Sequence, residues 1–174
     1  MKIRKEEKRD YPEVYELVKK AFETAEHADG NEQDLVEALR RSRAFVPGLS
    51  LVAEEDGKIV GHIMFTEIKI GDKIGLALAP LSVTPEHQGK GIGMKLIKEG
   101  HRIAAQKGYE ISVLVGIEEY YPKAGYEKAE KYGIKDPFGV PSENFMACGL
   151  GRKIGQYNGT VEYADEFYEA AKGQ

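Results

Sequence analysis

The chain has 174 residues, of which 41% are hydrophobic and 31% charged, and this is the composition of one globular domain with a core of its own. A formal net charge of −4 argues against a nucleic-acid-binding protein, and a single cysteine excludes a disulfide framework and a cysteine-rich metal site. The charged first residues precede no apolar segment, and no stretch reaches the roughly 18 apolar residues of a membrane span, so we expect a cytoplasmic protein without a membrane partner.

Periodicity along the first part of the chain predicts alternating helices and strands. Apolar residues at every third or fourth position indicate helices, and extended runs between turn residues indicate strands. An Asp-Gly pair at residues 56–57 is typical of a hairpin turn between two strands. The predicted elements are a strand at 1–4, helices at 11–25 and 32–40, and strands at 49–54 and 58–70.

The run 74–83 is the most apolar of the chain, which predicts a strand covered on both faces near the centre of a sheet. Pro80 lies within this run and cannot donate a main-chain hydrogen bond, so we expect a bulge or a break in pairing there. Further elements are predicted as a helix from 92 to 107 closed by Gly108, a strand at 110–115, a short helix within 117–124, a final strand pair at 126–132 and 143–150 joined by the loop 134–142, and a strand at 160–163 in the tail.

A glycine-rich loop, Gln88-Gly89-Lys90-Gly91-Ile92-Gly93, joins the central strand to the next helix. The first turn of a helix leaves main-chain N–H groups unpaired and carries a partial positive charge, so it favours an anion. Glycines allow the main chain to approach that anion closely, although they could also serve only a tight turn and close packing. The sequence therefore predicts a diphosphate site in this loop.

Two common phosphate-binding patterns fail in this loop. A Walker loop requires Ser or Thr after Gly-Lys, and Gly89-Lys90 is followed by Gly91. The dinucleotide pattern Gly-x-Gly-x-x-Gly requires glycine where the chain has Met94 or Leu96. The pattern that fits is Gln-x-x-Gly-x-Gly.

That pattern, at Gln88, Gly91 and Gly93, resembles the pyrophosphate-binding motif of the GNAT acyltransferase superfamily. Downstream, Tyr120-Tyr121-Pro122-Lys123-Ala124-Gly125-Tyr126 resembles the Tyr-x-Lys-x-Gly-aromatic motif of the same superfamily. The resemblance covers roughly residues 2–150 and implies a mixed α/β fold. We expect one GNAT-like domain at 1–150, with a central, mostly antiparallel sheet of about seven strands, a splayed parallel pair and about four flanking helices. The tail 151–174 is expected to be a C-terminal extension packed on the same domain.

The resemblance also implies an acetyl-CoA-dependent N-acetyltransferase, which transfers the acetyl group directly to a primary amine of a small molecule or a protein. Coenzyme A is then expected between the strands 74–83 and 110–115, and no metal is expected. The alternative is a non-catalytic acyl-CoA-binding or regulatory module. The residues expected to bind the cofactor are Leu81, Ser82, Val83, Gln88, Gly89, Lys90, Gly91, Ile92 and Gly93.

Direct acetyl transfer requires a donor for the developing oxyanion and a proton for the departing thiolate. By resemblance, the main-chain N–H of Val83 is the oxyanion donor and Tyr121 is the general acid. Pro122 disfavours helical geometry at Tyr121, where the family places this tyrosine on a helix, so Tyr120 is the substitute if the register differs by one residue.

The sequence leaves the general base open. Glu67 and His62 lie on one predicted strand and face opposite sides, so at most one of them points at the cleft. His27 and Asp29 lie in a loop of the region that shapes the acceptor site in this family, while Cys148 fits buried packing better than nucleophilic catalysis. Seven tyrosines of the last third could wall an acceptor pocket, form a homodimer face, or be half-buried strand and surface residues: Tyr120, Tyr121, Tyr126, Tyr132, Tyr157, Tyr163 and Tyr168.

Overall fold

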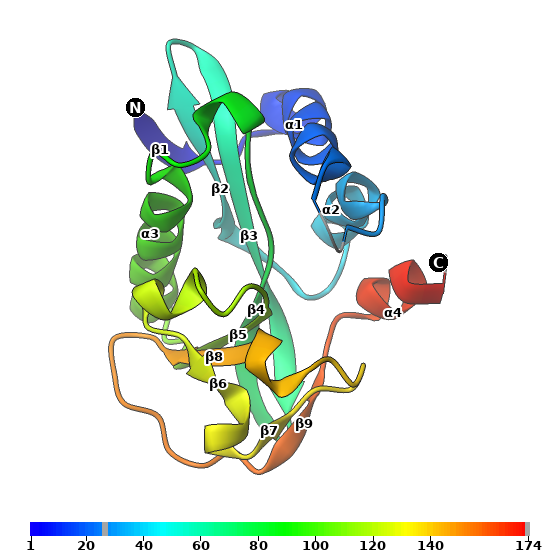
Figure 1. The fold of residues 1–174 in the computed structure, drawn as a ribbon, viewed down its shortest axis with the longest axis vertical. Coiled ribbons are helices and arrows are strands. Elements are labelled where there is room, and N and C mark those ends of the chain that lie inside the picture. Colours follow the sequence, from blue (N-terminus) through cyan, green and yellow to red (C-terminus); the bar gives the residue numbers. More distant parts are fainter. Residues whose placement is uncertain (26–27, 173–174) are drawn as a thin grey trace.

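The structure of the chain is a computed structural model that describes residues 1–25 and 28–172 (Figure 1). Its α-helices are α1 (Tyr11–Glu23), α2 (Glu32–Arg40), α3 (Ile92–Gln106) and α4 (Asp165–Lys172). Its strands are β1 (Lys2–Lys5), β2 (Phe45–Glu55), β3 (Lys58–Ile70), β4 (Lys73–Val83), β5 (Ile111–Val115), β6 (Glu127–Lys128), β7 (Ile134–Lys135), β8 (Phe145–Gly149) and β9 (Gly159–Glu162).

The strands form one sheet in the order β1-β2-β3-β4-β5-β8-β6, and β9 joins it beside β3 and also pairs with β7. Along the main path every pair is antiparallel except β4 and β5, which run parallel. Figure 1 shows α3 on one face of the sheet and α1, α2 and α4 on the other. The mixed α/β fold, with its mostly antiparallel sheet and its parallel pair, is therefore confirmed.

Close packing fixes α3 against the sheet. A Cβ atom on Gly100 of α3 would overlap the ring of Phe65 on β3, and a Cβ atom on Gly61 would lie 3.0 Å from Leu96. Leu96, Ile97 and Phe65 are fully buried in this layer. Because the helix lies so close to β3, its first turn is held beside the end of β4.

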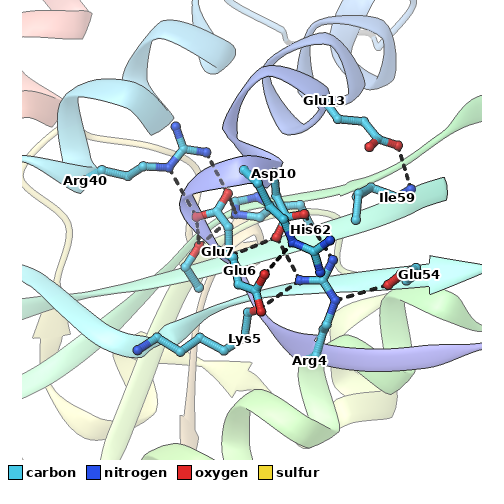
Figure 2. Close-up of polar contacts among 12 residues, drawn as sticks. Arg4, Lys5, Glu6, Glu7, Asp10, Glu13, Arg40, Glu54, Ile59 and His62 are labelled. Carbon is cyan, nitrogen blue, oxygen red and sulfur yellow. Dashed lines mark hydrogen bonds and ion pairs between the residues drawn. The ribbon is translucent and has the colours of Figure 1, made fainter. Parts of the chain in front are cut away.

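On the face of the sheet opposite α3, a buried polar network connects α2 to β2 and β3 (Figure 2). Arg40 donates from Nη2 to Glu6 Oε2 over 2.6 Å, and the Ser50 hydroxyl donates to Glu6 Oε1 over 2.8 Å. Nε2 of His62 lies 2.9 Å from the same hydroxyl oxygen. Since the one proton of Ser50 goes to Glu6, His62 must donate from Nε2, which leaves its Nδ1 without a proton.

The segment after β8 contacts both β3 and the start of α2. Glu162 and Val161 of β9 pair with Lys69 and Ile70 of β3. The Asn31 side chain, at the start of α2, donates to the carbonyl oxygen of Ala170 on α4 over 3.2 Å. Within residues 1–25 and 28–172, no helix has the length and apolarity needed to cross a membrane.

The strand predicted at 126–132 is wrong over most of its length. Only Glu127–Lys128 is extended, and a 3-10 helix, Ala129–Tyr132, follows it and ends at Gly133 with φ of +69°. Burial of Ala129 turns the chain inward at this point and outweighs the extended pattern of the segment. The predicted loop 134–142 likewise begins with a short strand, β7, which pairs with β9.

Candidate active site

The parallel strands β4 and β5 pair over a short distance and then separate. Their registered pairs are Leu76 with Ser112 and Ala77 with Val113. Beyond these pairs β5 remains bound to β8 as far as Val115, while β4 continues along β3 to Val83. The two strands therefore splay toward their carboxyl ends.

A bulge in β4 lies at the start of this splay. Ile63 of β3 pairs with Leu81, but Phe65 pairs with Leu78, so Ala79 and Pro80 together oppose one residue of β3. This register shift confirms the bulge predicted at Pro80. The proline has no N–H to donate to the ladder, so regular pairing is interrupted there.

The main-chain groups of Leu81 and Val83 point toward the opened side of β4. Thr84 donates its N–H to the carbonyl oxygen of Val60 over 3.0 Å, which marks Thr84 and Val60 as a hydrogen-bonded pair of the ladder. Such pairs alternate along an antiparallel ladder, so Ser82 also faces β3, whereas Leu81 and Val83 face the side that β5 has left. The main-chain groups of Ser82 therefore do not face the opened side as those of Leu81 and Val83 do. The Ser82 hydroxyl is buried on the face opposite α3 with no partner among the described residues.

The glycine loop follows directly and presents main-chain donors at the same end of the sheet. Gly89 and Gly91 have φ of +79° and +83°, and a Cβ atom on either would meet nothing within 4 Å. The first helical bond of α3 runs from Lys95 N to Gly91 O over 3.1 Å, so the N–H groups of the three residues between them, 92 to 94, have no acceptor within the helix. Gln88 donates from Nε2 to the carbonyl oxygen of Val83 over 3.1 Å and folds the loop over the end of β4. Open space beside free N–H groups suits a phosphate group.

Tyr121 is the first residue of a 3-10 helix, Tyr121–Ala124, with Pro122 in its first turn. The predicted conflict between Pro122 and a helical position is therefore wrong, since proline is tolerated in the first turn of a helix. The ring of Tyr121 packs against Gly116 at the end of β5, where a Cβ atom would overlap it. The Tyr121 side chain is thereby placed at the mouth of the splay.

Tyr120 packs edge-on against Tyr121, with ring centroids 5.0 Å apart. Its hydroxyl lies beside Gly93 in the first turn of α3, where it occupies the space of a missing Cβ atom. Leu81 and Val83 pack in the same cluster as both tyrosines. The second motif is thus brought against the glycine loop.

Burial, and to a smaller extent the nearby Tyr120, raises the pKa of Tyr121 to about 12. Burial also raises the pKa of Tyr120. A phenol with a raised pKa keeps its proton throughout the neutral range, so Tyr121 is available there as a proton donor.

Asn144 clamps the site from a segment in which no site residue was predicted. Gly116 donates its N–H to the Asn144 carbonyl oxygen over 2.8 Å, and the Asn144 side chain donates to the Gly116 carbonyl oxygen over 3.1 Å. These bonds hold the glycine against which Tyr121 packs. The one signal in the sequence is Gly116 itself, a glycine directly after a strand, which often marks a close approach.

The structure confirms that His62 and Glu67 face opposite sides of β3. His62 is fully buried beneath α1, and this burial lowers its pKa to about 4, so it is a weak base near neutral pH. Glu67 accepts a hydrogen bond from Tyr109 on the α3 side, and it lies six residues along β3 from Gly61, the partner of Val83. At the usual rise per residue this is about 20 Å. Neither side chain is a candidate base in this geometry.

The remaining candidates lie apart from the splay or outside the described residues. His27 is outside the described residues, and Asp29 is exposed, with its N–H bonded to Glu32. Cys148 is buried, which raises the pKa of its thiol to about 11 and makes a thiolate nucleophile unfavourable. Among the residues that the structure describes, no three His, Cys, Asp or Glu side chains are grouped as metal ligands.

Comparison with known proteins agrees with this geometry. Residues 2–129 match the family model described as an acetyltransferase (GNAT) domain. The chain belongs to the GNAT acetyltransferase family. It is 34% identical over 149 residues to the uncharacterized N-acetyltransferase YjhQ of Escherichia coli strain K12, and the match covers 83% of this chain and 79% of that protein.

Two solved structures of GNAT proteins resemble the whole chain. One is a GNAT family acetyltransferase from Brucella melitensis in complex with acetyl-CoA, with 35% identity, a TM-score of 0.79, and coverage of 95% of this chain and 97% of that one. The other is YhbS from Escherichia coli in complex with CoA, with 26% identity, a TM-score of 0.84, and coverage of 96% and 91%. The predicted membership of the GNAT family is confirmed.

Proposed function

We propose that this GNAT protein is an acetyl-CoA-dependent N-acetyltransferase that transfers the acetyl group directly to a primary amine. The observation that carries the proposal is the splay of β4 from β5, which leaves the main-chain groups of Leu81 and the N–H of Val83 without a strand partner beneath the glycine loop. An acyl carrier with a diphosphate and an amide-containing arm matches these donors in type and order. The complexes of the two structural relatives with acetyl-CoA and CoA support this choice of ligand.

In the proposed complex, the loop from Gln88 to Gly93 holds the pyrophosphate through its main-chain N–H groups. Lys90 is exposed beside the loop and adds positive charge. Leu81 binds the pantetheine arm as an additional strand would, because its N–H and carbonyl groups face the opened side. The N–H of Val83 faces the same side and contacts the thioester oxygen at the end of that arm. The ring of Tyr121 lies at the end of β5, on the other side of the splay from Leu81 and Val83.

The chemistry then needs three groups. A neutral amine attacks the thioester carbonyl, and the N–H of Val83 donates to the oxyanion as it forms. Tyr121 gives its proton to the sulfur as the C–S bond breaks, and the proton that the attacking nitrogen loses restores the phenol through solvent. The thiolate is a weaker base than the phenolate, since its conjugate thiol has an ordinary pKa of about 8.5 in the cysteine analogue, so this transfer is tied to the breaking of the C–S bond. General acid catalysis of this kind contributes about 100- to 10,000-fold to the rate.

The proposal also includes the domain boundaries and the cellular location. We assign residues 1–150 to the acyltransferase domain and residues 151–174 to an extension packed on it. A cytoplasmic location fits the supply of acetyl-CoA.

Two measurements on the purified protein test the proposal. Acetyl-CoA at about one hundred times its Kd should stabilise the folded state by about 2.7 kcal/mol and raise the melting temperature, whereas NAD at the same concentration should not. Release of free thiol should accelerate when a suitable amine is added to the acetyl-CoA complex. Absence of any thermal shift would overturn the proposal. A thermal shift without amine-dependent thiol release across polyamines, aminoglycosides, amino acids and peptide N-termini would instead establish a non-catalytic acyl-CoA-binding module.

A further inference from the structure

The proposed diphosphate site consists of two halves, and the half that precedes α3 has no hydrogen bonds of its own. We call the main-chain N–H groups from Gly89 to Gly93 the cradle. The N–H groups of its first three residues, 89–91, have no acceptor among the described residues. Gly89 and Gly91 have φ of +79° and +83°, a region open to glycine. Such a segment keeps one conformation only if its ends are held from outside.

The second half of the cradle is held on β3. Its residues, Ile92 and Gly93, are the first two of α3. The side chain of Ile92 is buried against Gly61 of β3, where a Cβ atom would lie 3.1 Å from it. The helical half of the cradle therefore has a fixed position relative to β3. A diphosphate can contact both halves at once only if the loop half is also fixed relative to that strand.

His87 connects the loop half to β2. It is the last residue of the 3-10 helix Pro85–His87 and directly precedes Gln88. Its Nδ1 lies 2.8 Å from the hydroxyl oxygen of Thr84, and its Nε2 lies 3.3 Å from Oε2 of Glu55, the last residue of β2. Figure 1 shows the segment after β4 crossing the ends of β3 and β2 before it enters α3. The imidazole lies at this crossing.

Both ring nitrogens of His87 have a partner, so the orientation of the ring is defined. The carboxylate of Glu55 can only accept, which favours a proton on Nε2. A neutral ring with that proton accepts at Nδ1, and the Thr84 hydroxyl is then the donor. Thr84 precedes the 3-10 helix, yet its side chain caps no main-chain N–H of that helix. The hydroxyl therefore serves the ring of His87 rather than the turn.

The other side-chain anchor of the loop connects it only to β4. Gln88 donates from Nε2 to the carbonyl oxygen of Val83 over 3.1 Å, and this bond is exposed. Val83 belongs to the strand from which the loop starts, so the bond does not fix the loop relative to β2 or β3. Of the two anchors, His87 is the one that reaches the hairpin of β2 and β3, on which α3 packs.

We propose that His87, through its contacts with Thr84 and Glu55, is a positioning residue that aligns the loop half of the cradle with the helical half. This inference rests on the proposed function, because the ligand is the diphosphate of coenzyme A. His87 acts through the main chain that follows it, so its loss should weaken ligands that contain the diphosphate and spare those that lack it. Electrostatics alone predicts that removal of the negative charge of Glu55 strengthens anion binding, whereas the positioning role predicts that it weakens binding.

The test measures the Kd of CoA by calorimetry and kcat/KM with acetylpantetheine, a donor without the diphosphate. We expect His87→Ala to raise the Kd of CoA about tenfold and to change kcat/KM with acetylpantetheine by less than about twofold. Glu55→Ala should also weaken CoA binding, and the double variant should bind no more weakly than His87→Ala alone. His87→Gln keeps a donor for Glu55 and should recover part of the loss. Glu86→Gln is the matched control, since it removes an exposed charge from the same 3-10 helix and should not weaken CoA binding.

Backbone order parameters of the ligand-free protein provide a readout that needs neither ligand nor turnover. In the wild type we expect values of about 0.85 for the amides of residues 89–91, as in rigid backbone. In His87→Ala these values should fall below about 0.6, while the amides of Ile92 and Gly93 stay rigid on α3. A variant that is merely less stable would not lose order at these three residues alone.

The outcomes separate this inference from the proposed function. Unchanged CoA affinity in His87→Ala, an equal loss with acetylpantetheine, or tighter CoA binding by Glu55→Ala would overturn the positioning role and leave the transferase assignment in place. If no amine releases thiol, weaker CoA binding in both variants together with the loss of order at residues 89–91 would still support the positioning role.

Discussion

The ring of Tyr121 packs directly on Gly116, and no side chain at residue 116 could be accommodated without moving it. This contact joins the end of β5 to the start of the second motif. It places the proposed acid through a glycine that Asn144 holds from the other side. The position of the acid therefore depends on a residue with no functional group of its own.

Replacement of Gly116 by Ala should displace Tyr121 and lower kcat. The added methyl group overlaps the ring, so overpacking should also cost about 1–3 kcal/mol of the free energy of unfolding. Gly155→Ala is the control, because a Cβ atom there meets nothing within 4 Å. Steady-state kinetics together with urea denaturation measure both effects. Unchanged kcat in Gly116→Ala would show that the ring position does not matter for turnover.

Replacement of Tyr121 by Phe should lower kcat by about 100-fold or more while the affinity for acetyl-CoA stays nearly constant. The phenol has a pKa of about 12, so it keeps its proton at every pH commonly used for assays. We therefore expect kcat in the wild type to show no alkaline decline from loss of this acid up to about pH 10.

Tyr120→Phe serves as the matched control for the acid assignment. Its hydroxyl contacts Gly93 rather than the opened side of β4, so its loss should change kcat much less. If Tyr120→Phe were the damaging substitution and Tyr121→Phe were active, the acid would be Tyr120.

The contact between Tyr120 and Gly93 can be tested by a double-mutant cycle. Gly93→Ala places a methyl group where the Tyr120 hydroxyl lies and should destabilise the protein by about 1–3 kcal/mol. Tyr120→Phe removes that hydroxyl, and the ring carbon behind it lies 3.6 Å from the position of the new methyl group, so the double variant should recover most of the loss. Urea denaturation of the four proteins gives the coupling energy. Additive effects would contradict the contact.

Much of this site follows from local patterns in the sequence. The glycine spacing from Gln88 to Gly93 predicts a helix N-terminus with open donors, and Pro80 predicts the bulge at the splay, because both depend on backbone properties of single residues. The family membership also follows from the glycine loop together with the second motif, residues 120–126. The orientation of Leu81 and Val83 away from β3 could not be derived without the register of β3 and β4.

Other parts depend on long-range contacts that the sequence does not carry. The clamp between Asn144 and Gly116 joins residues 28 positions apart through side-chain and main-chain bonds, and no periodicity encodes it. The residue types after Tyr126 predict a strand, yet the burial of Ala129 turns the segment into a 3-10 helix. Tertiary packing overrides local propensity at such edges.

The buried histidine predicts a loss of stability in acid. Burial lowers the pKa of His62 to about 4, whereas an unfolded histidine has a pKa near 6.5, so the unfolded state binds the proton first as pH falls. The contribution of His62 is therefore complete above about pH 6.5 and is lost as pH falls toward 4, by roughly 3 kcal/mol in total. Urea denaturation across this range measures the slope, and nitrogen NMR of the histidine rings assigns it. A His62 ring that is protonated in the folded protein at pH 6 would contradict the prediction.

Arg40→Met should be among the more damaging substitutions outside the catalytic site. Arg40 and Glu6 form an ion pair of 2.6 Å with side chains only 7% and 2% exposed, so removal of the arginine leaves a buried carboxylate without its counterion (Figure 2). Loss of one partner from such a pair costs about 3–5 kcal/mol. Glu6→Gln in the same protein should restore part of this stability, because the amide oxygen can still accept from Ser50 and no charge is buried. The exposed pair of Arg9 and Glu7 provides the control, and Arg9→Met should leave the urea midpoint unchanged. Equal effects of the two arginine substitutions would show that burial does not govern the strength of these ion pairs.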